Sequence, residues 1–454
     1  MPDLLATPND WPRILLARAG KPGASIAGPA RPPYDPGDLE AATAAGAWAG
    51  FRRVVRDLGP TGTIATIAAS GLRGRGGGGF PTGEKWRTAA QQPVDRRFVV
   101  ANGYEADPAA AADRTLMTID PHAVVEGLAI AAFAVGASEA VIAVRIEATE
   151  VIAALEAAVL AAERGGLLGV DVLGSGHDVI VTIRPVGGAY MLGEETVLLK
   201  ALEGKRGQPE QRPPYPAVRG LFGAPTVVNN VQTLAAVPWI VVNGAPAFAA
   251  IGSKASPGTV LVHVRGPRGE GIAEIPLGTP LRAVAALAGG VGDGRSRKAL
   301  LVGGPSGGLL PDSVADTAYE FEALEAVGGH LGSRSIVEVD DRACIVDLGR
   351  LLTRFCADEA CGKSIPCRIG TRRIAEIAER AVAGTPRAND DGLLADLAHD
   401  VVESGLCDHE RLATLPMTTG MRYFREELDA HLLRGTCPAG VCHPIALPTP
   451  PPAH

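Results

Sequence analysis

Residues 71–86 read GLRGRGGGGFPTGEKW and combine many glycines with basic side chains. Glycine lacks side-chain bulk and permits positive φ, so the backbone N–H groups of such a loop can converge on an anion. Arg73, Arg75 and Lys85 add positive charge around it. The loop therefore predicts a phosphate-binding site rather than a flexible surface turn.

Two familiar nucleotide-binding motifs fit this loop poorly. Gly74, Gly76 and Gly79 match G-x-G-x-x-G, but that motif follows a strand, and the preceding residues 63–70 (TIATIAAS) favour a helix. A P-loop places Lys directly after its last glycine, whereas here a glutamate stands before Lys85. Other segments must therefore identify the phosphate ligand.

A second group of residues able to do chemistry lies near the C-terminus, where all seven cysteines fall between Cys344 and Cys442. An odd number of thiols crowded into one region suits metal ligation better than disulfides. Cys344, Cys437 and Cys442 with His431 supply three thiolates and one imidazole, a closed tetrahedral zinc set. His443 is an alternative ligand. The alternatives to zinc are reduced structural cysteines or binding of a partner's cluster.

The composition limits the class of protein. The chain has 454 residues, 46% of them hydrophobic, and a formal net charge of -7 with a pI near 5.8. This length allows several domains, and the acidic balance argues against a nucleic-acid-binding protein, which needs a basic face. The sequence has neither a long apolar span nor a recognisable secretory signal. We expect a cytoplasmic protein without membrane insertion, or one peripheral to a membrane complex.

The elements that must position these residues begin after a Pro/Gly-rich arm at 1–36. Between residues 37 and 250, helical patterns alternate with apolar strands at 97–102 (RFVVAN), 139–146 (EAVIAVRI) and 178–183 (DVIVTI). Such alternation predicts an α/β domain with a largely parallel sheet covered by helices. The remaining chain is expected to form a small β-rich domain (251–335), a helical metal-binding domain (336–444) and a disordered tail (445–454).

Four further segments accompany the glycine loop, at 102–114 (NGYEADPAAAADR), 120–127 (DPHAVVEG), 187–209 (GGAYMLGEETVLLKALEGKRGQP) and 213–234 (PPYPAVRGLFGAPTVVNNVQTL). In this order and spacing, the five segments resemble the NADH-oxidising flavoprotein subunit of respiratory complex I. That family also supplies diaphorase subunits to NAD-linked hydrogenases and formate dehydrogenases. The resemblance covers most of the chain. It implies a Rossmann-like FMN-binding domain, then a β-grasp-like (SLBB) domain, then a helical iron-sulfur domain.

The resemblance also implies the residues of an FMN and NAD(H) site. FMN contacts are expected from Gly74, Arg75, Gly76, Gly77, Lys85, Asn102, Tyr104, Val228, Asn229, Asn230 and Thr233. Contacts on the nucleotide side are expected from Phe80, Tyr190, Gly193, Glu194, Glu195 and Tyr215. Glu105, Asp107 and Glu195 are expected to act in catalysis. Taken singly, each of the three aromatic residues is more often a core residue.

The second segment departs from the family pattern N-A-D-E-x-E-P, because it reads NGYEADP at 102–108. Tyr104 replaces an acidic residue expected beside the flavin, and Asp107 shortens one expected beside the nicotinamide. Loss of an anion near the isoalloxazine ring is expected to favour the reduced, anionic flavin. The sequence therefore leaves open the reduction potential of the flavin and which electron donor the site prefers.

The iron-sulfur motif also departs from the family pattern. Members of the family hold a [4Fe-4S] cluster with C-x-x-C-x-x-C and a later fourth cysteine. The matching residues here are Cys361, Ser364, Cys367 and Cys407, so a hydroxyl replaces one thiolate. Three interpretations remain: Ser364 ligates as an alkoxide, the cluster is three-iron or labile, or no cluster forms. Cys356 substitutes only if the helix predicted around it bends.

Two functions follow from these patterns. In the first, the chain passes electrons from NADH through FMN and a [4Fe-4S] cluster to a thioredoxin-like [2Fe-2S] subunit or a ferredoxin-type partner. In the second, it is a structural subunit that binds flavin or nucleotide and has lost iron-sulfur electron transfer. Retention of the glycine turns and the VVNN segment favours the first.

Overall fold

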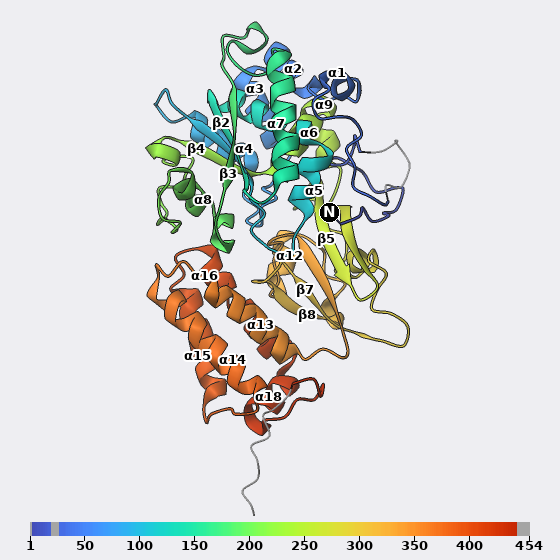
Figure 1. The fold of residues 1–454 in the computed structure, drawn as a ribbon, viewed down its shortest axis with the longest axis vertical. Helices are drawn as coiled ribbons and strands as arrows, with labels where there is room; N and C mark the ends of the chain where they lie inside the picture. The colour runs from blue at the N-terminus through green and yellow to red at the C-terminus, as the bar shows by residue number, and fades with distance from the viewer. Residues whose placement is uncertain (1, 20–26, 443–454) are drawn as a thin grey trace, which may run out of the picture.

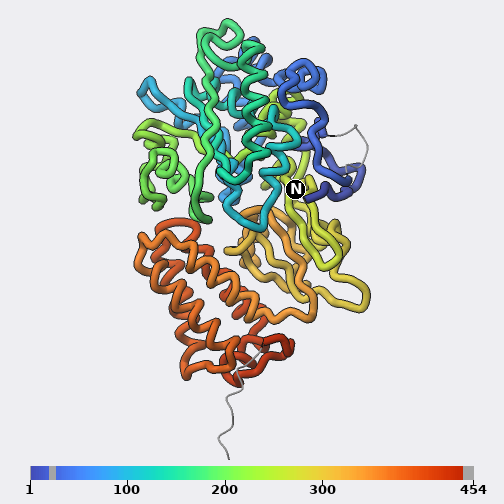
Figure 2. The backbone as a smooth tube through the Cα atoms, viewed as in Figure 1, coloured from blue at the N-terminus to red at the C-terminus, as the bar shows by residue number. Residues whose placement is uncertain are grey.

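The computed structural model describes residues 2–19 and 27–442. Figures 1 and 2 show an α/β unit at one end of the molecule, a small sheet packed beside it, and a helical unit at the other end. The expected disordered tail (445–454) and the alternative zinc ligand His443 lie outside the described residues.

The α/β unit is built on a four-stranded parallel sheet in the order β3-β2-β1-β4. Its strands are β1 (Phe98–Gly103), β2 (Glu139–Arg145), β3 (Ile180–Val186) and β4 (Thr226–Asn230). The first three confirm the predicted strands. Because β1 and β4 run in the same direction, their carboxyl ends meet, and Asn102 pairs with Asn230 there. Two predicted cofactor residues thus lie side by side.

Helices enclose this sheet and bury its apolar residues. They are α1 (Leu39–Ala44), α2 (Ala49–Arg53), α3 (Gly59–Ala69), α4 (Thr82–Ala90), α5 (Ala112–Ile119), α6 (Pro121–Val135), α7 (Thr149–Arg164), α8 (Glu195–Leu202), α9 (Val231–Asn243) and α10 (Ala245–Ala249). The glycine loop joins α3 to α4, so the helix expected before it is confirmed and the loop is not a Rossmann strand turn.

Helix α6 is the central helix of this core, and every one of its residues is buried. The side chain of Asp120 caps its N-terminus by accepting the N–H of Ala123, Pro121 occupies the first turn, and Gly136 ends it in the left-handed region at φ 70°. No single described helix is long and apolar enough to cross a membrane. Helices α5 and α6 pass that test only together, as a pair bent by 94°.

The N-terminal arm is anchored by two buried carboxylates. Glu274 accepts the backbone N–H groups of Ile14, Leu15 and Leu16 at 2.7, 2.8 and 2.9 Å. Asp120 accepts Arg18 Nε at 2.7 Å. The arm therefore becomes ordered by lying on the other units, as expected for a segment with little periodicity of its own.

The second unit is a five-stranded sheet in the order β6-β5-β9-β7-β8, in which β5 and β9 are parallel and the other pairs antiparallel. Its elements are β5 (Thr259–Gly266), β6 (Gly269–Pro276), α11 (Leu281–Ala286), β7 (Arg297–Val302), β8 (Gly308–Pro311), α12 (Phe321–Ala326) and β9 (Ser335–Asp340). The boundary expected at residue 335 is corrected, because it would separate the central strand β9 from its own sheet.

The third unit is helical, as expected. It contains α13 (Ile345–Asp358), a π-helical turn (Pro366–Thr371), α14 (Arg372–Val382), α15 (Asp390–Glu403), α16 (Asp408–Leu412), α17 (Leu415–Tyr423) and α18 (Arg425–Arg434). The short helix α16 lies at the end of this unit that faces the α/β unit (Figure 1). The iron-sulfur residues therefore lie at the junction between units.

Candidate cofactor and metal sites

The glycine loop has the form of an anion cradle. The N–H of Gly74 bonds to the carbonyl of Phe80 at 2.9 Å and closes the loop. The N–H groups of residues 76–79 make no well-aligned hydrogen bond within the described part of the chain. Gly77 has φ 108°, and a Cβ on Gly79 would lie 2.6 Å from the Phe321 ring. A glycine turn whose amides make so few well-aligned internal bonds fits a phosphate group.

Lys85 supplies the positive charge beside this loop. Its Nζ lies 3.0 Å from the carbonyl oxygen of Val228 and 3.1 Å from Glu195 Oε2. Glu195 also faces Arg212, at 3.3 Å from its Nη1. Arg212 was not predicted as a site residue, although it lies directly between two of the recognised segments. These contacts bring the glycine-loop segment, β4 and the first residue of α8 together.

Arg75 corrects one expectation. Its side chain is 1% exposed, and the guanidinium donates to the backbone carbonyls of Pro257 and Thr259 in the second unit. Burial, together with the positive charges of Arg73 and Arg334, lowers its pKa to about 9. The Arg75 side chain therefore does not bind phosphate. It joins two units, and its N–H bonds to Thr233 Oγ1 at 2.8 Å.

Polar groups line the carboxyl ends of β1 and β4. Asn230 Nδ2 donates to Asp113 Oδ2 at 2.7 Å, and Asn102 Nδ2 donates to the carbonyl of Gly193 at 3.4 Å. Asn229 is instead turned into the core, where its Oδ1 accepts Trp86 Nε1 at 2.9 Å. The backbone of Asn229 thus remains at the sheet edge, but its side chain is a packing contact.

The residues that follow β1 are more deeply buried than the sequence suggests. Tyr104 is 1% exposed, packs in an apolar cluster that contains Met191 and Leu192, and lies under the Arg145 guanidinium at 4.8 Å from the ring centre. Burial raises the pKa of Tyr104. Its hydroxyl has no hydrogen-bond partner among the described residues. The tyrosine that replaces an acidic residue thus acts as a core side chain.

Two acidic residues predicted to act in catalysis, Glu105 and Asp107, accept hydrogen bonds from other parts of the chain. Glu105 has φ 48°, and its Oε1 accepts the N–H of Asp113 at 2.8 Å. Asp107 Oδ2 accepts the hydroxyl of Ser333 at 2.6 Å and thereby contacts the second unit. Their expected roles at the nicotinamide remain predictions.

The predicted nucleotide residues fall into two sets: some make contacts inside the protein, and others are exposed. Glu194 caps α8 by accepting the N–H of Val197 at 2.9 Å, and burial raises its pKa. The Tyr190 ring packs against Phe355 at 5.3 Å and His409 at 5.7 Å, so it faces the helical unit. Phe80 and Tyr215 are 56% and 57% exposed, and Arg212 lies over the Tyr215 ring at 5.9 Å from its centre. The structure thus favours these two as stacking surfaces over Tyr190.

The iron-sulfur residues converge at the same end of the helical unit. Burial, together with the negative charges of Glu410, Cys407 and Cys361, raises the pKa of the Cys367 thiol to about 12. Burial likewise raises the pKa of Cys407 to about 11. Cys407 and the partly buried Cys361 also pack in the same apolar cluster, so these two predicted ligands lie in the same part of the fold. Ser364 donates a hydrogen bond to Glu410, a residue that the sequence analysis did not predict because it belongs to no motif.

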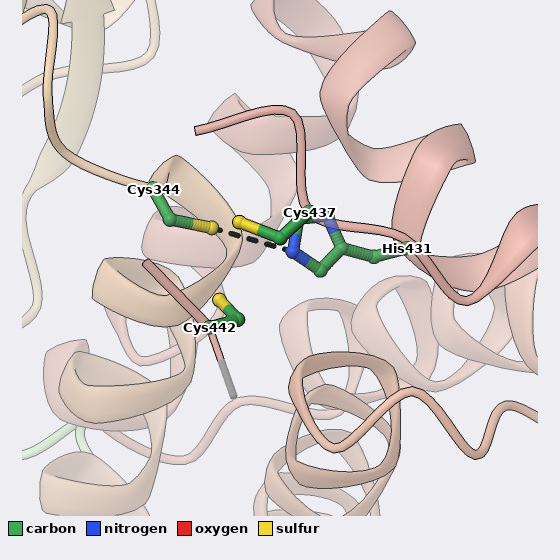
Figure 3. A group of neighbouring side chains, drawn as sticks. All are labelled: Cys344, His431, Cys437 and Cys442. Carbon is green, nitrogen blue, oxygen red and sulfur yellow. Dashed lines mark hydrogen bonds between the residues drawn. The ribbon is translucent and has the colours of Figure 1, made fainter. Parts of the chain in front are cut away.

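The predicted zinc set is assembled in Figure 3. One ligand atom from each of Cys344, His431, Cys437 and Cys442 lies within 4.8 Å of the others. His431 Nδ1 lies 2.8 Å from the carbonyl of Glu427, so the hydrogen-bonded Nδ1 leaves Nε2 to face Cys344 Sγ at 3.4 Å. Burial raises the pKa of Cys344 and raises that of Cys442 to about 11.

Cys437 differs from the other thiols of the set. Burial tends to raise its pKa, but hydrogen bonds from the N–H groups of Cys442 and Val441 and from the side chains of Cys442 and His431 lower it to about 6. A thiol that ionises this easily is a ready metal ligand. Three thiols and one imidazole at these distances fit a tetrahedral zinc ion.

Comparisons with known proteins agree with this geometry. Residues 67–239 match the family model described as the Nuo51 FMN-binding domain, and residues 347–431 match the NADH-ubiquinone oxidoreductase-F iron-sulfur binding region. NADP-reducing hydrogenase subunit HndC of Solidesulfovibrio fructosivorans is 38% identical over 90% of this chain and 83% of its own. The NADH-quinone oxidoreductase-F 2 protein of Rhizobium meliloti is 38% identical over 87% of this chain and 94% of its own.

The chain belongs to the NADH-quinone oxidoreductase-F family. A crystal structure of an NAD+-reducing [NiFe]-hydrogenase in the H2-reduced state is similar at a TM-score of 0.77 and 35% identity. That similarity covers 85% of this chain but only 65% of the hydrogenase chain.

Family membership confirms the predicted fold class, the FMN-binding domain and the iron-sulfur region. The individual site residues remain predictions. Of the zinc set, only His431 falls inside a matched range, since Cys344, Cys437 and Cys442 lie outside residues 347–431. The sequence analysis also did not predict Asp113, which accepts a hydrogen bond from Asn230, or Arg334, which bonds to Asp113. Asp113 lies in a recognised segment, but Arg334 has no local sequence signal.

Proposed function

We propose that this subunit takes electrons from NADH at the glycine loop and delivers them through the cysteine site to a partner redox protein. The observation that carries the proposal is the glycine loop beside Lys85, whose N–H groups at residues 76–79 make no well-aligned hydrogen bond among the described residues, inside the range that matches the FMN-binding family model. A structural subunit would not need that arrangement.

Each part of the pocket has a task in this proposal. The amides and Lys85 hold the phosphate of FMN, and the flavin, when bound, accepts a hydride and releases electrons singly. Phe80 and Tyr215 are exposed aromatic rings available for stacking. Glu195 is repelled by phosphate but can accept hydrogen bonds from ribose hydroxyls or the nicotinamide amide. Lys85 and Arg212 fix its carboxylate from two sides.

Direct contacts join this pocket to the cysteine site. The N–H of Tyr190 bonds to Glu359 Oε2 at 2.8 Å. The carbonyl of Cys361 accepts Gln208 Nε2 at 3.4 Å, and Lys363 Nζ bonds to the carbonyl of Pro209. These bonds hold the iron-sulfur loop against the turn that carries the nucleotide residues.

The partner is proposed to be a thioredoxin-like [2Fe-2S] subunit or a ferredoxin-type protein, and the location cytoplasmic, peripheral to a larger assembly. HndC and the similar crystal structure are both parts of hydrogenases that react with NADP or NAD+. The replacement of a thiolate by Ser364 is the observation that favours the second candidate, a structural subunit without iron-sulfur electron transfer.

Anaerobic purification followed by flavin, iron and zinc analysis separates the two candidates. The proposal predicts bound FMN, iron and about one zinc per chain, and an iron-sulfur EPR signal after NADH is added. Protein that contains FMN but neither iron nor an EPR signal would leave only the second candidate.

A further inference from the structure

A second oxygen donor lies beside Ser364. Ser364 Oγ donates to Glu410 Oε1 at 2.5 Å, and Glu410 Oε2 accepts the N–H of Leu406 at 2.7 Å. Ser364 lies midway in the C-x-x-S-x-x-C loop, and Glu410 lies in α16 one turn after Cys407. This hydrogen bond therefore joins the two segments that carry the cysteines, at the position where the family pattern has another thiolate.

Glu410 is also a buried carboxylate that lacks a cation. It is 1% exposed, and no Lys, Arg or His of residues 2–19 and 27–442 forms an ion pair with it. The adjacent Arg411 pairs with Asp408 instead, at 3.4 Å. Burying a carboxylate without a counter-charge costs several kcal/mol. An iron ion at this position would supply the missing charge.

The charge of the ligand set favours the same assignment. Replacing a cysteine by serine removes an anionic ligand, because a serine hydroxyl is neutral under ordinary conditions, whereas a carboxylate restores the lost charge. Carboxylate oxygen is a common iron ligand. Cys356 is a poorer substitute, since it is 0% exposed within α13 and its Sγ lies 3.6 Å from the carbonyl of Pro305.

We propose that Glu410, held in place by Ser364, supplies the fourth ligand of the cluster, so that one iron is bound through oxygen and three through Cys361, Cys367 and Cys407. The inference rests on the proposed function in that a cluster forms. The oxygen-bound iron is the one most easily lost. Ferricyanide, a one-electron oxidant, then converts [4Fe-4S]2+ to [3Fe-4S]+ by accepting one electron, while one Fe2+ leaves.

The test compares wild-type protein with Glu410→Gln, Ser364→Ala and Ser364→Cys by iron content and EPR before and after ferricyanide. Wild-type protein is expected to lose about one iron in four and gain a three-iron signal. Glu410→Gln is expected to show that signal as isolated. Ser364→Ala should keep four irons, and Ser364→Cys should keep them even after oxidation.

Three outcomes would overturn the assignment. If Ser364→Ala loses the fourth iron and Glu410→Gln keeps it, the serine is the ligand. If both keep it and Cys356→Ala loses it, the ligand is Cys356. Wild-type protein without any iron also rejects the assignment. Bleaching of FMN by NADH, measured on the same samples, reports separately on the proposed function and shows that each variant is folded.

Discussion

The buried carboxyl group of Glu105, just after β1, makes the stability of the fold depend on pH. Its carboxylate is 7% exposed and pairs with Arg114 Nε at 3.0 Å. Burial raises its pKa from 4.5 to about 7, and the negative charge of Asp113 adds to the effect. Because the folded state holds this proton more tightly than the unfolded chain, proton release between these two pKa values works against folding.

The free energy of unfolding is therefore expected to fall as pH rises from about 4.5 to about 7. Glu105→Gln, which cannot ionise, should flatten that slope in thermal unfolding measured across the same range. Glu156→Gln, at an exposed position on α7, should leave the slope as in wild type. Equal slopes for Glu105→Gln and wild type would show that this carboxyl does not titrate as described.

Lys85 carries the charge that the phosphate cradle needs. Lys85→Met is expected to weaken FMN binding by roughly tenfold to a hundredfold, because a charged hydrogen bond contributes about 1.5–3 kcal/mol. Flavin fluorescence titration of apoprotein measures this. Arg87→Met is the matched control on the same helix, since Arg87 pairs with Glu84 at the surface. Similar losses in both variants would argue against a specific role for Lys85.

At the scale of elements, α6 and α9 pack closely enough to exclude a methyl group. A Cβ on Gly127 would overlap the carbonyl oxygen of Leu234, whereas one on Gly62 in α3 would meet only Leu58 Cβ at an ordinary 3.6 Å. Gly127→Ala is expected to destabilise the protein by about 2 kcal/mol through overpacking. Gly62→Ala should be neutral or stabilising by up to about 1 kcal/mol.

Chemical denaturation of both glycine variants checks this contact. A Gly127→Ala variant as stable as Gly62→Ala would mean that the two helices are further apart than described. Because Leu234 and Thr233 are neighbours on α9, the Gly127 variant should also weaken the support of the glycine loop.

Regular elements were the most predictable part of the fold. Apolar runs that alternate with helical patterns are local features of the sequence. They therefore predicted β1, β2, β3 and the helix before the glycine loop. The VVNN segment was recognised only as a pocket motif, although it forms β4. The boundary at residue 335 failed because β9 is the central strand of a sheet formed by distant segments, and that pairing leaves no local signal.

At the scale of the molecule, Arg334 joins the second sheet to the flavin unit. Its Nη2 lies 2.7 Å from Asp113 Oδ2, both side chains are almost fully buried, and its Nη1 donates to the carbonyl of Arg75 on the glycine loop. Arg334→Met should destabilise the protein by about 3 kcal/mol or more, since it leaves a buried carboxylate unpaired. It should also lower FMN affinity.

The control for Arg334 is Arg268→Met, whose partner Asp293 forms a surface pair beside the same sheet. Surface pairs contribute about 0–1 kcal/mol, so this variant should unfold almost as wild type does. Denaturation and flavin titration measure both effects. Unchanged stability in Arg334→Met would show that the two units are held together elsewhere.

The sequence could predict which chemistry the site performs better than which side chains perform it. Lys85 and the zinc set lie in segments whose residue types already indicate their role. Arg75, by contrast, sits in the glycine loop yet points into another unit, and Glu410 meets Ser364 across 46 residues. Such contacts depend on how units pack, which the spacing of residues along the chain does not encode.

The most direct measurement of the central claim is anaerobic stopped-flow mixing of the FMN-loaded protein with NADH. The account predicts a rapid loss of visible flavin absorbance, because the glycine loop, Lys85 and the exposed rings of Phe80 and Tyr215 hold flavin and nicotinamide together. Protein that holds FMN in its oxidised form unchanged in excess NADH would contradict the account.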